Sequence, residues 1–497
     1  MNKRLAGIVW VLAGIKLAIH LYADVGYGYF VDELYNVALA RHLDWGYVDV
    51  APMIALIGRI ELTLFGDSLT AIRILPAIAG AAMVVLAGLL ARELGGGRLA
   101  QGLAALCTLL APGFLALDHF LNINAFEPLA WMTCALLVIR MIRTENPKLW
   151  IWFGVVAGLG LETKHSMLIF GFALVVGLVL TRERRLLFNR WLVIGGAIAL
   201  VIWLPNLIWN VQHHFPFIEE QANIRRSGRD VSLSPVRFFA EESLAMLPLT
   251  VPIWIAGLVW LFRGGYRALA WAWCITAAII LMMSPRVYYL FPAYPLLFAA
   301  GSIAFERWDV RWVKPVYCAL MVLLGALLAP TLIPLLPPET YIRYSKATHL
   351  EQPRIETHDL GPLPQLFADQ FGWEDMAIAV ARVYNNLPPD IRARTAIFGQ
   401  NYGQAGAIDL FGPKYGLPPA ISGHQNYFYW GPRGYTGESM IVMGDRRERL
   451  EEIFTSLEYA GHVAHPYSMP YQHIDIYYCR GMKMPLSELW PKLKQWH

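Results

Sequence analysis

Long apolar segments recur through the first two thirds of the chain, and the last third mixes polar and apolar residues. Runs such as AIAGAAMVVLAGLL and IFGFALVVGLVL carry no charge, and ~20 apolar residues are enough to span a bilayer. The pattern predicts eleven membrane-spanning helices, which lie near residues 5–22, 69–91, 99–117, 125–142, 149–162, 166–181, 191–209, 244–262, 268–284, 287–305 and 313–335.

The connections between these segments differ in length and charge. Lys and Arg gather in alternate connections, which marks that side as cytoplasmic. The N-terminus is therefore expected inside and, with an odd number of spans, the C-terminal segment outside. The first apolar run resembles a signal peptide, but no small-residue cleavage site follows it, so a retained helix is expected.

Two long connections, 23–68 and 210–243, lie on the outer side of this topology. The first contains DELYNVALARHL and APMIALIGRIELTLFG, whose helical spacing is too short or too polar for a span. Both segments fit amphipathic helices at the outer membrane surface.

The segment 336–497 alternates expected strands and helices. The strands are expected at 395–399, 439–444 and 473–479, and the helices at 372–387, 404–412 and 446–461. Such alternation is typical of an α/β domain. The predicted fold is thus an α-helical polytopic membrane domain, 1–335, followed by a soluble, extracytoplasmic α/β domain, 336–497, which is expected to admit or orient the acceptor of the reaction inferred below.

Composition supports a membrane protein. The 497 residues are 56% hydrophobic and only 16% charged, against roughly 25% charged in an average soluble domain. The net charge of +4 is too small to indicate a nucleic-acid partner. The five cysteines form no C-x-x-C pair, so neither a zinc site nor a disulfide framework is indicated.

Polar residues gather at the outer ends of the predicted spans. A charge at membrane depth costs about 2.5–3.5 kcal/mol on insertion scales, so such residues are functional candidates. The candidates are Asp32, Glu33, Asp118, His119, Asn122, Asn124, Glu127, Glu162, Lys164, His165, Arg225, Arg226, Arg229, Arg286, Tyr288 and Tyr289.

Each candidate also has a structural interpretation. Asp32 could cap the helix that follows it, and Lys164 could extend its ammonium to the membrane surface. His165 could be an ordinary turn residue, and Arg225 and Arg226 could bind lipid phosphate without specificity. Asn124 and Glu127 could form hydrogen bonds between helices.

Several motifs together resemble a known family. They are the acidic pair after the first span, a surface helix, a P-x-x-x-x-x-x-R stretch, FGDSLTAIRILPAIAG, LNINAFEP, GLGLETKHS and YYLFPAYP. The chain is similar in these to the bacterial GT-C glycosyltransferases related to protein O-mannosyltransferases and to lipid A aminoarabinose transferases. The resemblance covers 1–305 and, weakly, the C-terminal segment.

The resemblance implies transfer of a sugar from a polyprenyl-phosphate donor on the extracytoplasmic face. Asp32 matches the family's acidic position, the expected general base, with Glu33 beside it. One departure is that Ala51 precedes Pro52, where the aminoarabinose transferases carry a lysine. The aspartate often found at the outer end of the fourth span is likewise replaced, here by Asn124 and Glu127.

The chemistry indicates the same roles. An acceptor hydroxyl must lose its proton as it attacks the anomeric carbon, and the leaving phosphate must be stabilised. Asp32 suits the first task, and cations suit the second. The expected phosphate and lipid contacts are Lys164, His165, Arg286, Tyr288, Tyr289 and one of Arg225 or Arg226, and the expected substrate pocket is His119, Asn122, Asn124 and Glu127.

One base candidate favours inversion at the anomeric carbon. No cofactor is required, although a divalent cation near Asp32 and Glu33 is an open alternative. The expected partners are a polyprenyl-phosphate sugar, an envelope glycan, lipid or protein acceptor, and the bilayer of a bacterial inner membrane. A secondary transporter, or a flippase or binding protein for lipid-linked glycans, remains the alternative, although the sequence shows no internal repeat of the kind that transporters carry.

Overall fold

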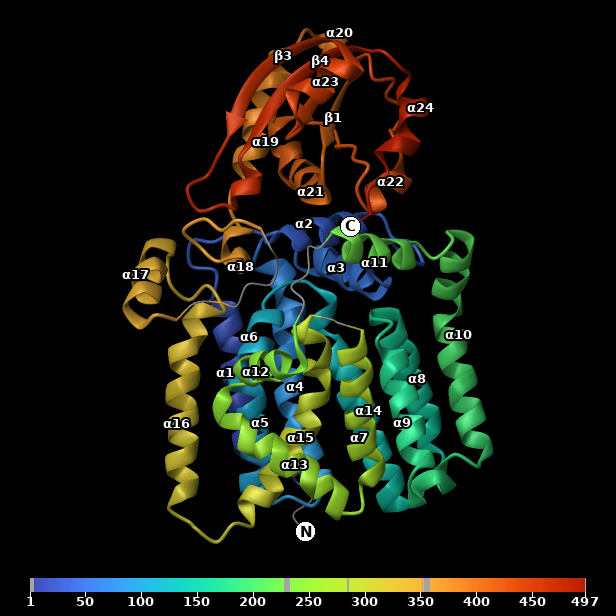
Figure 1. Ribbon diagram of the computed structural model, residues 1–497, viewed down its shortest axis with the longest axis vertical. Helices are drawn as coiled ribbons and strands as arrows, with labels where there is room; N and C mark the ends of the chain where they lie inside the picture. The colour runs from blue at the N-terminus through green and yellow to red at the C-terminus, as the bar shows by residue number, and fades with distance from the viewer. Residues whose placement is uncertain (1–3, 228–232, 284–285, 351, 353–357, 497) are drawn as a thin grey trace.

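The computed structural model describes residues 4–227, 233–283, 286–350, 352 and 358–496. A bundle of apolar helices forms one end of the molecule, and a domain containing a β-sheet forms the other (Figure 1). Between them lies a layer of short helices from the two long connections. The C-terminus of the chain returns to this middle layer.

Helices occupy all eleven positions predicted from the apolar pattern. They are α1 (Gly7–Tyr22), α4 (Ile74–Glu93), α5 (Arg98–Leu110) with α6 (Pro112–Leu117), α7 (Glu127–Thr144), α8 (Leu149–Thr163), α9 (Met167–Val179), α10 (Arg190–Gln212), α13 (Val251–Arg263), α14 (Arg267–Met282), α15 (Tyr294–Glu306) and α16 (Val313–Leu328). Short 3-10 helices precede or follow some of them, among them η1 (Ala71–Arg73), η2 (Ile123–Ala125), η5 (Val287–Ala293) and η6 (Ala329–Thr331).

Fewer of these helices are long enough to cross a membrane unaided. Within the described residues, five meet a strict test of length and hydropathy: Ala71–Glu93, Ile123–Thr144, Arg190–Gln212, Val287–Glu306 and Val313–Thr331. A sixth arises if Pro235–Ala245 and Pro248–Arg263, which meet at 101°, are taken as one broken span. Five further apolar helices are shorter, so the number of eleven spans is not confirmed.

Glycines allow neighbouring helices of the bundle to approach closely. A Cβ atom added to Gly154 of α8 would lie 2.0 Å from the carbonyl oxygen of Gly195 in α10. A Cβ on Gly301 of α15 would lie 1.8 Å from the carbonyl oxygen of Ile253 in α13. Small residues at such crossings are typical of helix packing in membranes, where contact between backbones replaces hydrophobic driving force.

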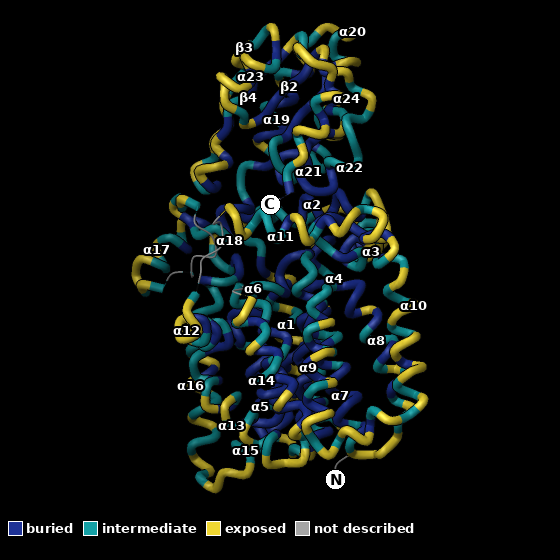
Figure 2. The backbone as a smooth tube through the Cα atoms, turned by 45° about the vertical axis from the view of Figure 1, so that its right-hand side comes forward, coloured by how far each residue is buried: buried dark blue, intermediate teal, exposed yellow. Residues whose placement is uncertain are grey.

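The outermost helices, α10 and α16, expose most of their surface along the sides of the bundle (Figure 2). Their exposed side chains are apolar, including Val201 and Leu323. Large exposed apolar surfaces of this kind fit a lipid environment rather than water.

Both long connections form helices, which the sequence predicted for the first of them. The first connection contains α2 (Val31–Arg41) and α3 (Met53–Leu64), and the second contains α11 (Pro216–Ser227) and α12 (Pro235–Ala245). Helices α2, α3 and α11 lie between the bundle and the C-terminal domain (Figure 1). Helices α17 (Pro338–Thr348) and α18 (Gln365–Ala368) then lead to that domain.

The C-terminal domain contains a four-stranded sheet in the order β1-β2-β4-β3. Strand β1 (Thr395–Gly399) pairs parallel with β2 (Ser439–Met443), while β4 (Ile474–Met482) pairs antiparallel with both β2 and β3 (Phe454–Val463). The helices of the domain are α19 (Trp373–Asn385), α20 (Pro389–Arg392), α21 (Tyr402–Phe411), α22 (Asn426–Trp430), α23 (Arg447–Ile453) and α24 (Leu486–Leu489).

One element of this domain differs from the sequence prediction. The segment 446–461 was expected to be a single helix, but the helix ends at Ile453 and β3 begins at Phe454. Residues 454–463 pair antiparallel with β4 along most of their length, and this pairing determines their conformation. Thr455, Tyr459 and Val463 are residue types that suit a strand.

The core of the C-terminal domain includes a helix from the first connection. Leu34, Tyr35, Ala38 and Leu39 of α2 are buried in one cluster with side chains of α19 and α21. Helix α2 thus lies before the boundary expected at residue 336, yet it belongs to the hydrophobic core of the domain that follows that boundary.

Candidate functional site

The first turn of α2 places Asp32 and Glu33 in different surroundings. Glu33 is fully buried, and its two carboxylate oxygens accept hydrogen bonds from Arg73 at 2.9 and 2.5 Å. The backbone N–H groups of Phe30 and Leu121 donate to the same carboxylate at 2.9 and 3.2 Å. Glu33 thus joins the start of α2 to η1 and to the loop before α7.

Arg73 is the centre of a wider ionic network. It also pairs with Asp24, which follows α1, and Nε2 of His119 lies 2.9 Å from the same aspartate. Burial alone would raise the pKa of Asp24, but Arg73 and His119 hold it below its usual value. Burial and the nearby Arg73 lower the pKa of His119, which favours the neutral imidazole.

The network continues toward the membrane. Lys16 of α1 and Asp118 form a fully buried ion pair of 2.9 Å, and the rings of His20 and His119 stack with centroids 5.7 Å apart. Buried pairs of this kind are costly to break, because either partner alone would be an uncompensated charge. The network therefore fixes α1, η1 and the first outer connection relative to one another.

Asp32 lies on the opposite side of this turn, next to the C-terminal domain. The hydroxyl of Tyr402 donates a hydrogen bond of 2.8 Å to Oδ1 of Asp32. A further acid, Asp49, lies within electrostatic range of Asp32, and Glu220 lies within range of Asp49. Burial raises the pKa of Asp49 well above its usual range, and the charges of Glu220 and Asp32 add to this effect.

Lys164 is the cation of a second cluster. Its ammonium donates hydrogen bonds of 2.8 Å to Asn124 Oδ1 and to Glu127 Oε2, and it lies over the rings of Tyr288 and Tyr289 at 5.3 and 4.6 Å from their centroids. Five candidate residues from three separate connections are thus in direct contact. An ammonium has three donors, and these two bonds use two of them.

His165, next to Lys164, connects this cluster to the first outer loop. Its Nε2 lies 3.1 Å from Asn206 Oδ1, and the amide of Asn206 donates to the carbonyl oxygen of Trp45 at 2.8 Å. Burial lowers the pKa of His165. Asn206 belongs to α10 and was not singled out from the sequence.

An open cavity of about 540 Å³ borders this connection beside α10. Its lining combines apolar and polar side chains, namely Asp44, Trp45, Val201, Leu204, Pro205, Ile208, Trp209, Gln212 and His213. A cavity lined by both kinds of side chain suits an amphipathic ligand.

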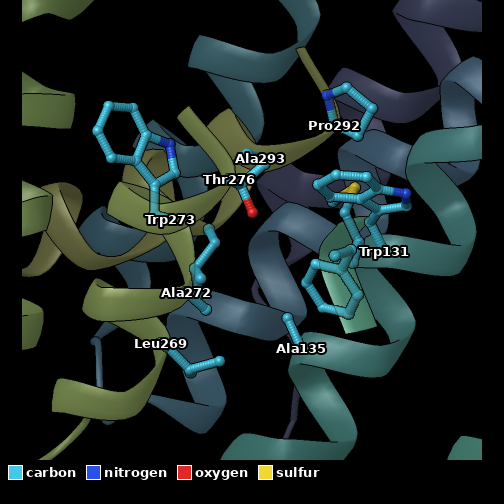
Figure 3. Close-up of a pocket in the computed structure, with 11 residues that line it drawn as sticks. Trp131, Ala135, Leu269, Ala272, Trp273, Thr276, Pro292 and Ala293 are labelled. Atoms are coloured by element: carbon cyan, nitrogen blue, oxygen red, sulfur yellow. The ribbon is translucent and has the colours of Figure 1, made fainter. Parts of the chain in front are cut away.

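A second pocket lies within the bundle, between α7, α9, α14 and η5 (Figure 3). Trp131, Trp273 and Pro292 are among its lining residues. Its volume is about 20 Å³, which is close to the space that one water molecule requires. This is a packing gap, and it has no room for a substrate.

Asn122 lies beside the Lys164 cluster, because it accepts from the backbone N–H of Asn124 at 2.8 Å and thereby caps η2. Arg225 and Arg226 are exposed at the end of α11, and Arg286 precedes η5. Arg229 lies outside the described residues.

Asp32 and Glu33 are the two acids at which the sequence left a divalent cation open. Across the described parts of the chain, no group of three or more His, Cys, Asp or Glu side chains is arranged to hold a metal ion. Because Arg73 already occupies the Glu33 carboxylate, a cation at Asp32 would depend on ligands from substrate or water.

Sequence reasoning missed several residues of these clusters: Lys16, Asp24, Asp49, Arg73, Glu220 and Tyr402. Lys16 and Arg73 could have been found, because each is a charge within or beside an apolar run. Tyr402 carried no such signal, because a tyrosine in a soluble α/β pattern is ordinary.

Comparison with known proteins identifies relatives of this arrangement. The family model described as dolichyl-phosphate-mannose-protein mannosyltransferase matches residues 49–209. The lipid A galacturonosyltransferase RgtD of Rhizobium johnstonii is 30% identical over 188 residues, which cover 37% of this chain and 39% of that relative. The matched region thus spans well under half of the curated protein.

Solved structures match over most of the chain. ArnT from Cupriavidus metallidurans, bound to undecaprenyl phosphate, matches with a TM-score of 0.61 and 15% identity, covering 95% of this chain and 97% of ArnT. The oligosaccharyltransferase AglB of Archaeoglobus fulgidus, in complex with an inhibitory peptide and a dolichol-phosphate, matches with a TM-score of 0.51 and 12% identity, covering 87% and 69%. Together with the family model, these matches confirm the resemblance to GT-C glycosyltransferases of the ArnT and protein mannosyltransferase type.

Proposed function

We propose that this chain, which has the fold of the GT-C membrane glycosyltransferases, transfers a sugar from a polyprenyl-phosphate donor to an acceptor hydroxyl at the outer membrane face. The observation that carries the proposal is the presence of both a carboxylate cluster and a cation cluster. A carboxylate, Asp32, lies at the C-terminal domain, and a cation, Lys164, lies at the outer ends of the helices.

In the proposed reaction, Asp32 accepts the proton of the acceptor hydroxyl. The hydroxyl oxygen bonds to the anomeric carbon while the bond from that carbon to the phosphate oxygen breaks, and the electron pair leaves with the phosphate. Lys164 stabilises the charge that develops there, because an ammonium is a compact point charge. A single displacement of this kind inverts the anomeric centre.

Lys164 is well placed for an anionic lipid head group. Its bonds to Asn124 and Glu127 orient the ammonium, and the two tyrosine rings lie beside it. The cavity beside α10 is linked to this cluster, because Trp45 of its lining accepts a hydrogen bond from Asn206, the partner of His165. In the proposed reaction, the lipid-linked substrate reaches Lys164 by way of this cavity.

The proposal includes a topology. All eleven apolar helices span the membrane of a bacterial cell, the N-terminus lies in the cytoplasm and the 336–497 domain lies outside. Glu33, which is bound by Arg73, is assigned a structural role in this arrangement.

The general base is tested with Asp32→Asn. A panel of undecaprenyl-phosphate sugars is first screened with the wild-type protein in proteoliposomes, beginning with galacturonic acid and a lipid A acceptor because of the curated relative. We expect Asp32→Asn to lower kcat by about 10²- to 10⁴-fold, the usual contribution of a general base. Asp67→Asn, a carboxylate of the same loop that is 61% exposed, serves as the control. Full transfer by Asp32→Asn would refute the mechanism.

The carrier site is tested by thermal shift with undecaprenyl phosphate. We expect saturable stabilisation of the wild-type protein, and its loss in Lys164→Met. Lys148→Met is the matched control, because Lys148 also lies over an aromatic ring, that of Trp191, at the opposite end of α8. Solute counterflow without any response to the lipid would favour a transporter instead.

A further inference from the structure

We propose that the C-terminal domain supplies a positioning residue to the catalytic centre: the Tyr402 hydroxyl holds the Asp32 carboxylate in its working orientation. This inference rests on the proposed role of Asp32. It assigns the 336–497 domain a direct part in the reaction, beyond the expected contact with acceptor.

The first observation is the hydrogen bond itself. Tyr402 Oη donates to Asp32 Oδ1 over 2.8 Å, although the two residues are 370 positions apart in sequence. An aspartate side chain has two rotatable bonds, so a carboxylate on the first turn of a helix can adopt several orientations. A bond to one carboxylate oxygen selects among them.

The second observation is that Tyr402 is itself held firmly. Its ring stacks on Tyr35 at 4.7 Å and on His424 at 4.9 Å, with interplanar angles of 27° and 5°. Its backbone N–H donates to Nδ1 of His424 at 3.0 Å. Tyr402 begins α21, which Asn401 caps by accepting from the N–H of Gln404. A ring fixed on both faces presents its hydroxyl in one place.

The third observation is the close docking of the domain on α2. A Cβ atom on Gly406 of α21 would lie 3.0 Å from the backbone of Leu34, so α21 and α2 meet nearly backbone to backbone. The N–H of Val48 donates to Asn426 Oδ1 at 2.8 Å, and the N–H of Asn426 donates to the Tyr35 hydroxyl at 3.3 Å. The Tyr402–Asp32 distance is therefore set by an interface between the domain and the first outer loop.

The Tyr402 hydroxyl is a neutral donor to Asp32, and Asp49, which accepts from Tyr35 at 3.0 Å, lies within electrostatic range. A hydrogen bond to the ionised form of a carboxylate favours that form. The tyrosine hydroxyl supplies that bond without adding a charge that would compete for phosphate.

The test compares Tyr402→Phe in two backgrounds. In the wild-type background, we expect kcat to fall by about 10- to 100-fold with little change in the donor KM, which is the effect of a lost hydrogen bond to a charged group. In the Asp32→Glu background, whose carboxylate is already displaced by a methylene, the same change should cost less than about 2-fold. Activity is measured with the undecaprenyl-phosphate sugar that the wild-type protein uses.

Tyr415→Phe is the matched control. Tyr415 belongs to the same domain, and its hydroxyl donates to the carboxylate of Glu374 at 2.7 Å, away from Asp32. We expect this variant to keep wild-type kcat. The melting temperature of each variant in detergent shows whether the fold is retained.

Two outcomes would overturn the inference. One is unchanged kcat in Tyr402→Phe. The other is an equal fold-loss in both backgrounds, which is the result expected if the variant only weakens the fold. If Asp32→Asn is inactive while Tyr402→Phe is fully active, the positioning role fails and the proposed base stands; if Asp32→Asn is active, the proposed function itself fails.

Discussion

Two neighbouring carboxylates at the start of α2 have different partners, and their partners decide their roles. Glu33 and Asp32 are adjacent in sequence, yet one is paired with Arg73 inside the protein and the other meets a tyrosine of the C-terminal domain. On a helix, adjacent residues point about 100° apart, so a sequence pair rarely acts as a structural pair. The two acids were expected to act together, but Glu33 is held in an ion pair and only Asp32 remains a candidate for the chemistry.

Glu61 of α3 gives a pH-dependent prediction at this scale. Burial raises the pKa of Glu61 to about 8, although its carboxylate accepts a hydrogen bond from the N–H of Leu75. The pKa of Glu61 in the folded state lies above the usual value of 4.5. Its contribution to the free energy of unfolding is therefore fully present below pH 4.5 and is lost as the pH rises through about 8.

Glu61→Gln should remove this dependence, because glutamine keeps the acceptor and carries no charge. We expect the variant and the wild-type protein to melt at similar temperatures near pH 5, and the variant to melt higher at pH 8 to 9. Melting curves in detergent across this range provide the measurement. Parallel curves for the two proteins would contradict a buried, titrating Glu61.

At the scale of elements, helix α10 packs on α8 through a close contact that contains glycines. It is largely exposed and packs mainly on α8, where Gly195 meets the backbone of Trp150. Gly195 and its neighbour Gly196 form a natural comparison, because a Cβ on Gly195 would lie 2.2 Å from the Trp150 carbonyl oxygen, whereas a Cβ on Gly196 would meet nothing within 4 Å.

Gly195→Val should therefore separate α10 from α8 and lower the melting temperature, at a cost of about 1–3 kcal/mol. Gly196→Val makes the same change of residue on the next position of the same helix and should have little effect. Since Asn206 of α10 links His165 to Trp45, the first variant should also weaken stabilisation by undecaprenyl phosphate. Equal melting temperatures for the two variants would show that the close contact is unimportant.

At the scale of the whole molecule, the outer layer joins two parts that the sequence presents as separate. Helix α2 is buried in the core of the C-terminal domain, and its first turn is tied to the membrane helices through Glu33. Movement of the domain relative to the bundle is therefore coupled to the position of Asp32.

Gly406→Val tests this coupling in the full chain. The added side chain should push α21 away from Leu34 and lower kcat by moving Tyr402, while undecaprenyl phosphate still stabilises the protein through the separate Lys164 cluster. Ala393→Val, at an exposed position of the same domain, is the control. Loss of lipid stabilisation together with kcat would indicate general misfolding and count against a specific coupling.

The sequence could predict features that depend on local pattern. Apolar runs located the helices of the bundle, and the cost of charge near a membrane selected Lys164 and Glu127, which the structure brings into contact. The sequence pattern could not predict contacts that only the tertiary structure creates. The Tyr402–Asp32 bond joins distant segments, and β3 replaces part of an expected helix because β4 lies beside it.

The ion pair between Lys16 and Asp118 has a consequence for how the protein is made. Lys16 lies in the middle of the first helix, where an unpaired charge costs about 2.5–3.5 kcal/mol on insertion scales. Its partner is encoded about a hundred residues later, a delay of roughly 5–20 s at ordinary rates of synthesis. In the proposed topology, α1 is a poorly satisfied membrane helix until the ribosome has delivered Asp118, so its stable insertion depends on a residue that has yet to be translated.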